Sequence, residues 1–212
     1  LLCCNTYGAL SKNNQDPGGA YRPFDQNRSG FVIGEGAGIV VMESIQRAKG
    51  RGANILGLIS GYGTSCDGVD RINCANDGKE LARAIKMALD EAKANPEEID
   101  YISLDGLAVG LWDDSEIKAL KLVFGENLKN IPLSCPKSMF GNLLGASGVL
   151  DMIIALLTME HSLVPPTLNL EKPALSSLNY VAKESREHKV NKSLIISRGR
   201  GGINSVLVVE KV

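Results

Sequence analysis

The feature that most constrains the fold of this sequence is its alternation of strand-like and helix-like stretches. The strand-like stretches are short and rich in β-branched residues, and they lie at 55–62, 101–104, 131–134, 194–197 and 203–209. The helix-like stretches lie at 44–52, 77–95, 113–124 and 141–160. Strands that alternate with helices of about 10 to 20 residues are typical of a layered α/β fold.

Two of the helix-like stretches allow finer predictions. Stretch 113–124 should begin at Asp113 or Asp114, because either side chain can cap a first helical turn, and Gly125 should follow its end. Stretch 141–160 begins rich in glycine and continues apolar on nearly all faces. A helix that is apolar all round is expected to be buried on all sides.

The residues from Phe31 to Glu43 consist of two apolar runs joined by glycines, which predicts a β-hairpin. Gly34, Gly36 and Gly38 resemble a dinucleotide-binding loop, but such a loop must follow a strand and open a helix. Strand-like residues lie on both sides of these glycines, so close backbone packing explains them better.

Composition excludes several classes of function. The chain has 212 residues, is 44% hydrophobic and carries a formal net charge of −1, so we expect no nucleic-acid partner. No apolar run reaches the roughly 18 residues of a membrane span, since Asp151 interrupts the best one at 149–157. The five cysteines show no CxxC spacing, and their odd number argues against a disulfide framework. We therefore expect a reducing, cytoplasmic location.

The two histidines of the chain offer little chemistry. His161 closes a helix-like stretch, and His188 lies in a charged run. Both are predicted to be structural or surface residues, and we expect no metal site.

The candidate site lies in three glycine-flanked segments at the ends of predicted strands, namely 103–106, 136–142 and 197–204. In open α/β sheets, functional sites gather where strands end. The alternative is that these segments are only tight turns, and their spacing leaves both interpretations open.

The sequence resembles the C-terminal half of the β-ketoacyl-acyl-carrier-protein synthases. The motifs that carry the resemblance are RPFD at 22–25, GFVIGEGAG at 30–38, PKSM at 136–139, LLGA at 143–146, VPPTLN at 164–169 and the final glycine-rich hairpin. They match nearly the whole chain in one register. The resemblance implies a duplicated thiolase-like α/β fold, layered αβαβα, that works as a dimer. It also implies decarboxylative Claisen condensation without a metal or organic cofactor.

The resemblance further implies a division of the chain. Residues 1–62 would form the end of the N-terminal thiolase-like half, starting with the end of a buried helix at 1–10, and residues 63–212 the C-terminal half. The chain starts at Leu1, inside the family fold. We therefore expect the missing N-terminal half as a partner, a separate chain being one form of it, and an unpaired sheet edge at Phe31–Glu43.

Departures from the family pattern bear on activity. The family's nucleophilic cysteine lies upstream of the residues present here, and its two histidines are replaced by Asp105 and Asn142. Losing one oxyanion donor typically costs roughly 10²- to 10³-fold in rate. Two independent losses would cost on the order of 5–8 kcal/mol of transition-state stabilisation. An ionised Asp105 only accepts hydrogen bonds and would repel a developing enolate, whereas Asn142 can still donate.

Other family positions are also altered or reassigned. The family's gate loop carries a phenylalanine. This chain has Arg200 at that position, flanked by Gly199, Gly201 and Gly202. Lys137 and Glu116 match family positions and are expected to form a structural ion pair, with a catalytic remnant as the alternative. Pocket-floor candidates are Met139, Phe140 and Leu143, which core packing explains equally well.

The Asp105 replacement and the Gly-Arg-Gly-Gly loop are similar to the chain-length factor, or ketosynthase β-subunit, of type II polyketide systems. This implies a non-catalytic subunit that pairs with a catalytic ketosynthase and shapes the tunnel for a chain growing on acyl carrier protein. One alternative is an active β-ketoacyl synthase, acyltransferase or malonyl decarboxylase that uses non-standard residues. The other is a thiolase-fold protein that binds a carrier protein without chemistry.

Overall fold

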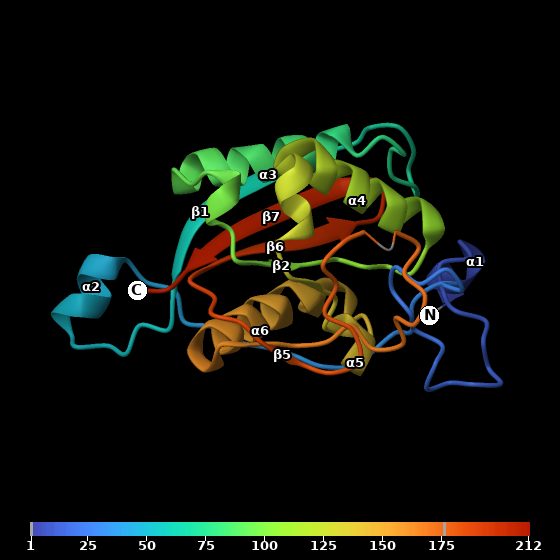
Figure 1. The fold of residues 1–212 in the computed structure, drawn as a ribbon, viewed down its shortest axis with the longest axis horizontal. Coiled ribbons are helices and arrows are strands. Elements are labelled where there is room, and N and C mark those ends of the chain that lie inside the picture. The colour runs from blue at the N-terminus through green and yellow to red at the C-terminus, as the bar shows by residue number, and fades with distance from the viewer. Residues whose placement is uncertain (1, 176) are drawn as a thin grey trace.

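The computed structural model describes residues 2–175 and 177–212 and shows a mixed sheet between two helical layers (Figure 1). The sheet has the order β1-β7-β6-β2-β3. Its strands are β1 (Leu58–Cys66), β2 (Tyr101–Ser103), β3 (Leu133–Ser134), β6 (Lys192–Gly199) and β7 (Ile203–Glu210). The predicted α/β class and the predicted final hairpin are therefore confirmed.

Helices cover both faces of this sheet (Figure 1). On one face lie α3 (Lys79–Ala92) and α4 (Gly110–Phe124), and on the other lies α6 (Ser147–His161). The shorter elements are α1 (Leu2–Thr6), α2 (Ile45–Gly50), α5 (Lys137–Phe140), η1 (Pro96–Glu98), η2 (Gly125–Lys129), η3 (Leu144–Ala146) and the small sheet β4 (Leu163–Val164) with β5 (Arg186–Glu187). Apolar core fills the space on both sides of the large sheet.

The pairing of the strands positions the candidate site. β2 is parallel to both β3 and β6, whereas β7 is antiparallel to β6 and β1. The carboxyl ends of β2, β3 and β6 therefore meet at one edge of the sheet, where open α/β folds place their sites. The segments 103–106, 136–142 and 197–204 all leave this edge.

α3 packs unusually close to β1 because glycines face it. A Cβ atom at Gly63 would lie 2.0 Å from the backbone oxygen of Ala84, and one at Gly61 would lie 2.0 Å from that of Ala88. These contacts are too short for any side chain, so the glycines fix the distance between helix and strand.

We expect Gly63→Ala to destabilise the protein by about 3 kcal/mol, because α3 must shift to accept the methyl group. Gly50→Ala is the matched control, since a Cβ atom there meets nothing within 4 Å. It should leave stability within about 1 kcal/mol of wild type. Urea unfolding of the intact protein measures both, and equal midpoints would contradict the prediction.

The predicted N-cap of α4 is wrong. The helix begins at Gly110 with Val109 as its N-cap, so Asp113 lies inside the first turn. The Asp113 carboxylate instead accepts a hydrogen bond from the Phe24 backbone N–H at 2.9 Å and lies 3.5 Å from Arg28 Nε. The Asp113 carboxylate that could have capped the helix is therefore engaged in a tertiary contact instead.

The predicted hairpin at Phe31–Glu43 is also wrong, because this segment forms only isolated bridges, Leu10 with Phe31 and Ile33 with Asn142. Its glycines face the region of α5 and α6. A Cβ atom at Gly34 would lie 2.2 Å from the Phe140 backbone oxygen, and Gly38 would crowd Val149. Alternate residues thus point at the helices, as in a strand, while the described chain supplies no neighbouring strand for a ladder. The close packing expected of the glycines is present.

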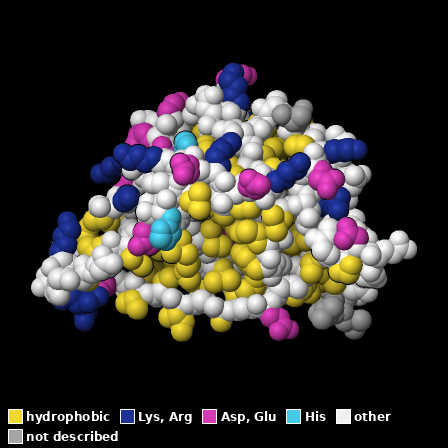
Figure 2. All heavy atoms as spheres, turned by 60° about the horizontal axis from the view of Figure 1, so that its bottom comes forward, with side chains coloured by type: hydrophobic (Ala, Val, Ile, Leu, Met, Phe, Trp, Pro, Cys, Tyr) yellow, Lys and Arg dark blue, Asp and Glu magenta, His cyan; other side chains and the backbone are white. Residues whose placement is uncertain are grey.

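The expectation that α6 is buried on all sides is wrong as well. Asp151, Ala155 and Met159 face the core, but Leu157 is 46% exposed. Figure 2 shows hydrophobic side chains gathered over the face that lies at the bottom of Figure 1. The exposed large hydrophobic side chains on or beside this face include Ile39, Val41, Met42, Leu56 and Val212, and with Leu157 they surround a cavity of about 790 Å³. We call this the apolar face.

One stretch of described residues, Leu144–His161, is long and apolar enough to cross a membrane, with a mean hydropathy of 1.3. Core helices of other proteins pass the same test. At its centre, Asp151 is fully buried and lies 2.6 Å from the Lys137 amine, which favours packing against protein. The expectation of no membrane span stays a prediction.

The segment before α2 is held to the body by polar contacts. Asp25 is fully buried, and its Oδ2 accepts hydrogen bonds from the backbone N–H groups of Glu171 and Lys172 at 2.9 and 2.7 Å. Asn169 Nδ2 donates to the backbone oxygens of Gly18 and Tyr21.

The helix end predicted at 1–10 is present as α1, although Leu1 itself lies outside the described residues. The prediction that this helix is buried is wrong, because Cys3 and Asn5 are exposed. In the part of the chain that the structure describes, no layer covers this side of α1.

Candidate functional site

The site is built where β2, β3 and β6 end. Asp105 follows β2, Lys137 opens the short helix after β3, and Arg198 lies at the end of β6. The Arg198 backbone N–H donates to Asp105 Oδ1 at 3.3 Å, and Lys137 Nζ lies 3.6 Å from the same oxygen. The three segments that the sequence singled out therefore meet at one place. Whether they form a functional site or are only tight turns stays a prediction.

Lys137 is a fully buried cation between two carboxylates. Its Nζ lies 2.6 Å from Asp151 Oδ2 and 3.6 Å from Asp105 Oδ1, and it donates to the Leu104 backbone oxygen at 3.5 Å. Burial alone would lower the pKa of Lys137, but the charges of Asp151 and Asp105 raise it above its usual value. Lys137 is therefore held as an ammonium ion.

The expected ion pair between Lys137 and Glu116 is wrong. Glu116 instead accepts hydrogen bonds from the backbone N–H groups of Asp105 and Gly106, at 2.7 and 3.1 Å. It thus fixes the turn that follows β2. Sequence reasoning missed Asp151 as the main partner of Lys137, although a carboxylate in the middle of an apolar helix was a usable signal.

The pKa of Glu116 lies close to neutral pH. Burial, together with the negative charge of Asp105, raises the pKa of Glu116 from 4.5 to about 7. Burial also raises the pKa of the neighbouring Asp113, to about 8. The folded protein therefore binds protons here that the unfolded chain has lost at neutral pH.

This arrangement predicts a dependence of stability on pH. Because the folded pKa of Glu116 is raised, its contribution to stability is complete below about pH 4.5 and is lost as the pH rises through about 7. One group changes stability by about 1.4 kcal/mol per pH unit in this window. Glu116→Gln cannot titrate, so the wild type should lose roughly 3 kcal/mol relative to this variant between pH 4.5 and pH 8.

Urea unfolding of the intact wild type and of Glu116→Gln across this range measures the difference. The variant should also be less stable at low pH, because a single amide oxygen replaces an acceptor of two backbone N–H groups. The protonation of Glu116 is tested by the difference in slope between the two curves of stability against pH, and not by the constant difference between them. Parallel curves would contradict the prediction.

The hydrogen bonds of Asn142 go to residues other than those of this charged cluster. Its Oδ1 accepts hydrogen bonds from the Leu144 backbone N–H at 2.8 Å and from the Ser147 hydroxyl at 3.1 Å. Its backbone pairs with Val32 and Gly34, which joins it to the segment at 31–34. Among residues 2–175 and 177–212, Asn142 Nδ2 has no hydrogen-bond acceptor, so the amide keeps its donor.

The proposed gate loop is the turn between β6 and β7. Gly201 and Gly202 have φ values of +80° and +76°, which favour glycine, and Arg200 is exposed. The Arg200 guanidinium lies over the Tyr7 ring, 3.7 Å from its centre. Tyr7 was not singled out by sequence reasoning, and no sequence motif marks it.

The three pocket-floor candidates differ in their surroundings. Leu143 is buried and would touch a Cβ atom built at Gly36, whereas Phe140 is half-buried and Met139 is 42% exposed. Core packing thus accounts for Leu143. A pocket role for Met139 and Phe140 stays a prediction.

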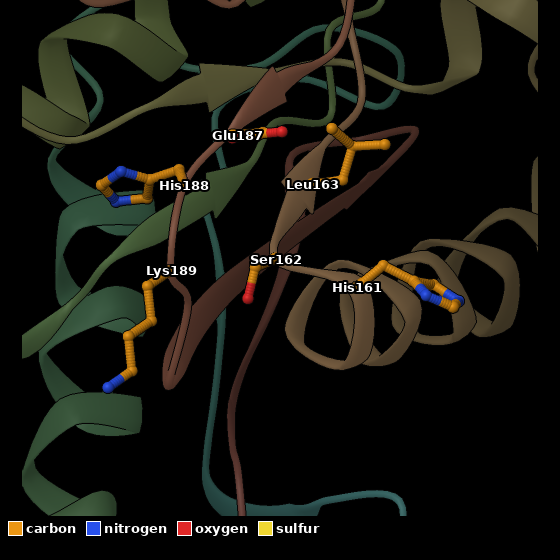
Figure 3. Close-up of a pocket in the computed structure, with 6 residues that line it drawn as sticks. All are labelled: His161, Ser162, Leu163, Glu187, His188 and Lys189. Atoms are coloured by element: carbon orange, nitrogen blue, oxygen red, sulfur yellow. The ribbon is translucent and has the colours of Figure 1, made fainter.

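The two histidines line one shallow hollow of about 470 Å³ at the end of α6 (Figure 3). Its other lining residues are Ser162, Leu163, Glu187 and Lys189. The rings of His161 and His188 point away from each other in Figure 3, and the His161 side chain is 64% exposed. This agrees with the surface role predicted for His161.

Comparison with known proteins decides the family. Residues 56–171 match the model of the β-ketoacyl synthase C-terminal domain, and residues 1–48 match that of the N-terminal domain. The chain belongs to the β-ketoacyl synthase family. Its thiolase-like α/β fold is shared with solved ketosynthases, which confirms the fold expected from the sequence motifs.

Curated relatives show which β-ketoacyl synthases this chain is similar to. The chain is 37% identical to the tetracenomycin polyketide synthase ketoacyl synthase alpha subunit of Streptomyces glaucescens, covering 100% of this chain and 50% of the relative. It is 40% identical to 3-oxoacyl-acyl-carrier-protein synthase 2 of Synechocystis sp., covering 96% and 49%. The chain spans about half the length of the curated relatives that it matches.

Two solved structures superpose well on this chain. One is a type II polyketide synthase acyl-carrier protein in complex with its ketosynthase bound to the hexaketide, with a TM-score of 0.94, 35% identity and coverage of 99% and 52%. The other is the ishigamide ketosynthase/chain length factor, with a TM-score of 0.90, 34% identity and coverage of 100% and 50%. This ketosynthase half is thus similar to those of type II polyketide synthases.

Proposed function

We propose that the protein containing this chain is a non-condensing, chain-length-factor-like subunit of a polyketide ketosynthase. The observation that carries the proposal is the position of Asp105 and its contacts. This carboxylate stands where the family has its first histidine, and its Oδ1 faces Lys137 and the Arg198 backbone N–H. A group that only accepts hydrogen bonds cannot stabilise an oxyanion.

Lys137 does not replace the missing donor. Its Nζ is fully buried and already engaged with Asp151, Asp105 and the Leu104 backbone oxygen. To reach a developing enolate it would have to leave two carboxylates unpaired in the core, which is costly. The cluster therefore supports a structural role for Lys137.

The partners follow from the proposed role. The similar solved structures are described as a carrier protein in complex with its ketosynthase and as a ketosynthase/chain length factor. We propose a catalytic ketosynthase and an acyl carrier protein as the partners of this protein, with a cytoplasmic location and no cofactor. We place the division between the two halves at residues 62 and 63. The apolar face would then be covered by the rest of the N-terminal half, which this chain does not contain.

A second candidate function rests on Asn142. Its Nδ2 remains available to donate, and relatives at 37–40% identity include a ketoacyl synthase alpha subunit. The alternative is therefore an active synthase or malonyl decarboxylase in which Asn142 supplies one oxyanion donor. The carrier-binding role without chemistry is a third outcome.

The test uses the intact subunit with and without its partner ketosynthase, and follows consumption of malonyl carrier protein. We expect no consumption by the subunit alone and chain elongation by the pair. Decarboxylation or elongation by this subunit alone would overturn the proposal. Failure of the subunit to alter product length in the pair would favour the carrier-binding role.

The variant Asn142→Ala separates the non-condensing subunit from the active synthase or decarboxylase. If Asn142 is an oxyanion donor, the variant should lower the rate at which the complex consumes malonyl carrier protein by roughly 10²- to 10³-fold. If the subunit does not condense, this rate should stay within about twofold of that of the wild-type complex. The amount of soluble complex is the control, because Asn142 also caps the turn at Leu144 and Ser147.

A further inference from the structure

The turn between β6 and β7 is built almost entirely of glycine. Gly199, Gly201 and Gly202 carry no side chain, and two of them adopt left-handed backbone conformations. Arg200 is therefore the turn's single side chain with which to contact the rest of the protein. Four such residues would move easily unless other contacts held them.

Backbone contacts hold the turn on one side only. The Gly201 N–H donates to the Ile72 backbone oxygen at 3.2 Å. The Gly202 oxygen accepts from the Asp67 backbone N–H at 2.9 Å and from Asn204 Nδ2 at 3.1 Å. These bonds all lead to the loop that follows β1 or to β7 itself.

The opposite side of the turn is held by a stacked cation. The Arg200 guanidinium lies 3.7 Å from the centre of the Tyr7 ring, just after α1. Figure 1 places α1 and the β6–β7 turn at the same end of the molecule. In the part of the chain that the structure describes, Arg200 forms no ion pair that would compete for its charge.

The base of the turn is anchored in the candidate site. Arg198 donates from Nε to Asn204, its guanidinium lies 4.9 Å from the centre of the Trp112 ring, and its backbone N–H donates to Asp105. The tip of the turn, at Arg200, thus lies two residues beyond Arg198, which is anchored to Asp105. At the tip, the contact that the structure describes with the N-terminal segment is that of Arg200 with Tyr7.

We propose that Arg200 and Tyr7 form a latch that holds the β6–β7 turn against the N-terminal segment and suppresses its opening. The latch restricts the motion of the turn, which begins next to Asp105. A cation over an exposed aromatic ring contributes about 0.5–1 kcal/mol. This inference is independent of whether the protein condenses acyl groups.

Hydrogen exchange of the Gly201 amide tests the latch, because this N–H bonds to Ile72 and exchanges only when the turn opens. In the intact protein, Arg200→Ala should speed the exchange about 2- to 5-fold, the factor equivalent to the energy of the contact. Tyr7→Leu should have the same effect. The double variant should exchange no faster than either single variant, since both remove one interaction.

Two variants serve as controls. Tyr7→Phe keeps the aromatic face and should leave the exchange at the wild-type rate. Arg47→Ala removes another exposed cation, from α2, and should also have no effect. Amides of α3 report whether the fold is intact in each variant. Unchanged exchange in Arg200→Ala, or additive effects in the double variant, would overturn the latch.

Discussion

The arrangement of the site depends on keeping one positive charge inside the protein. Lys137 has no exposed surface, and removing an ammonium ion from water costs several kcal/mol unless partners compensate. Asp151 from α6 and Asp105 from the end of β2 supply that compensation. The two ion pairs thereby tie α6 to the end of β2.

The same charge balance explains the unusual titration of the neighbouring carboxylates. Asp105 is engaged with Lys137, so its negative charge opposes ionisation of Glu116 across the turn that Glu116 holds. Catalytic machinery in a ketosynthase needs donors aimed at developing negative charge. Here the charges of Lys137, Asp151 and Asp105 compensate one another, which supports the proposed structural role of the cluster.

Much of the fold could be predicted from local sequence patterns. The amphipathic period at 77–95 gave the position of α3, and the glycine run at 199–202 gave the final hairpin. The start of α4 could not be predicted, because Asp113 bonds to Phe24, which is 89 residues away in sequence. Local capping rules contain no information about such a partner.

The candidate site was predictable as a place but not as a network. Strand ends and glycines located Asp105, Lys137 and Arg198 at one edge. The pairing of Lys137 with Asp151 depends on how α6 lies across the sheet, which no motif encodes. Likewise, the apolar composition of α6 indicated burial, and only the structure shows which of its faces the described chain covers.

The bonds of Asp25 and Asn169 have a consequence for the connectivity of the chain. They join residues near 20 to residues near 170 directly, without passing through the sheet. The polypeptide between α2 and β1 is therefore a covalent link that the folded N-terminal segment does not need for its attachment. A protease that cuts in this link would yield two fragments that stay together as one particle and separate only in denaturant.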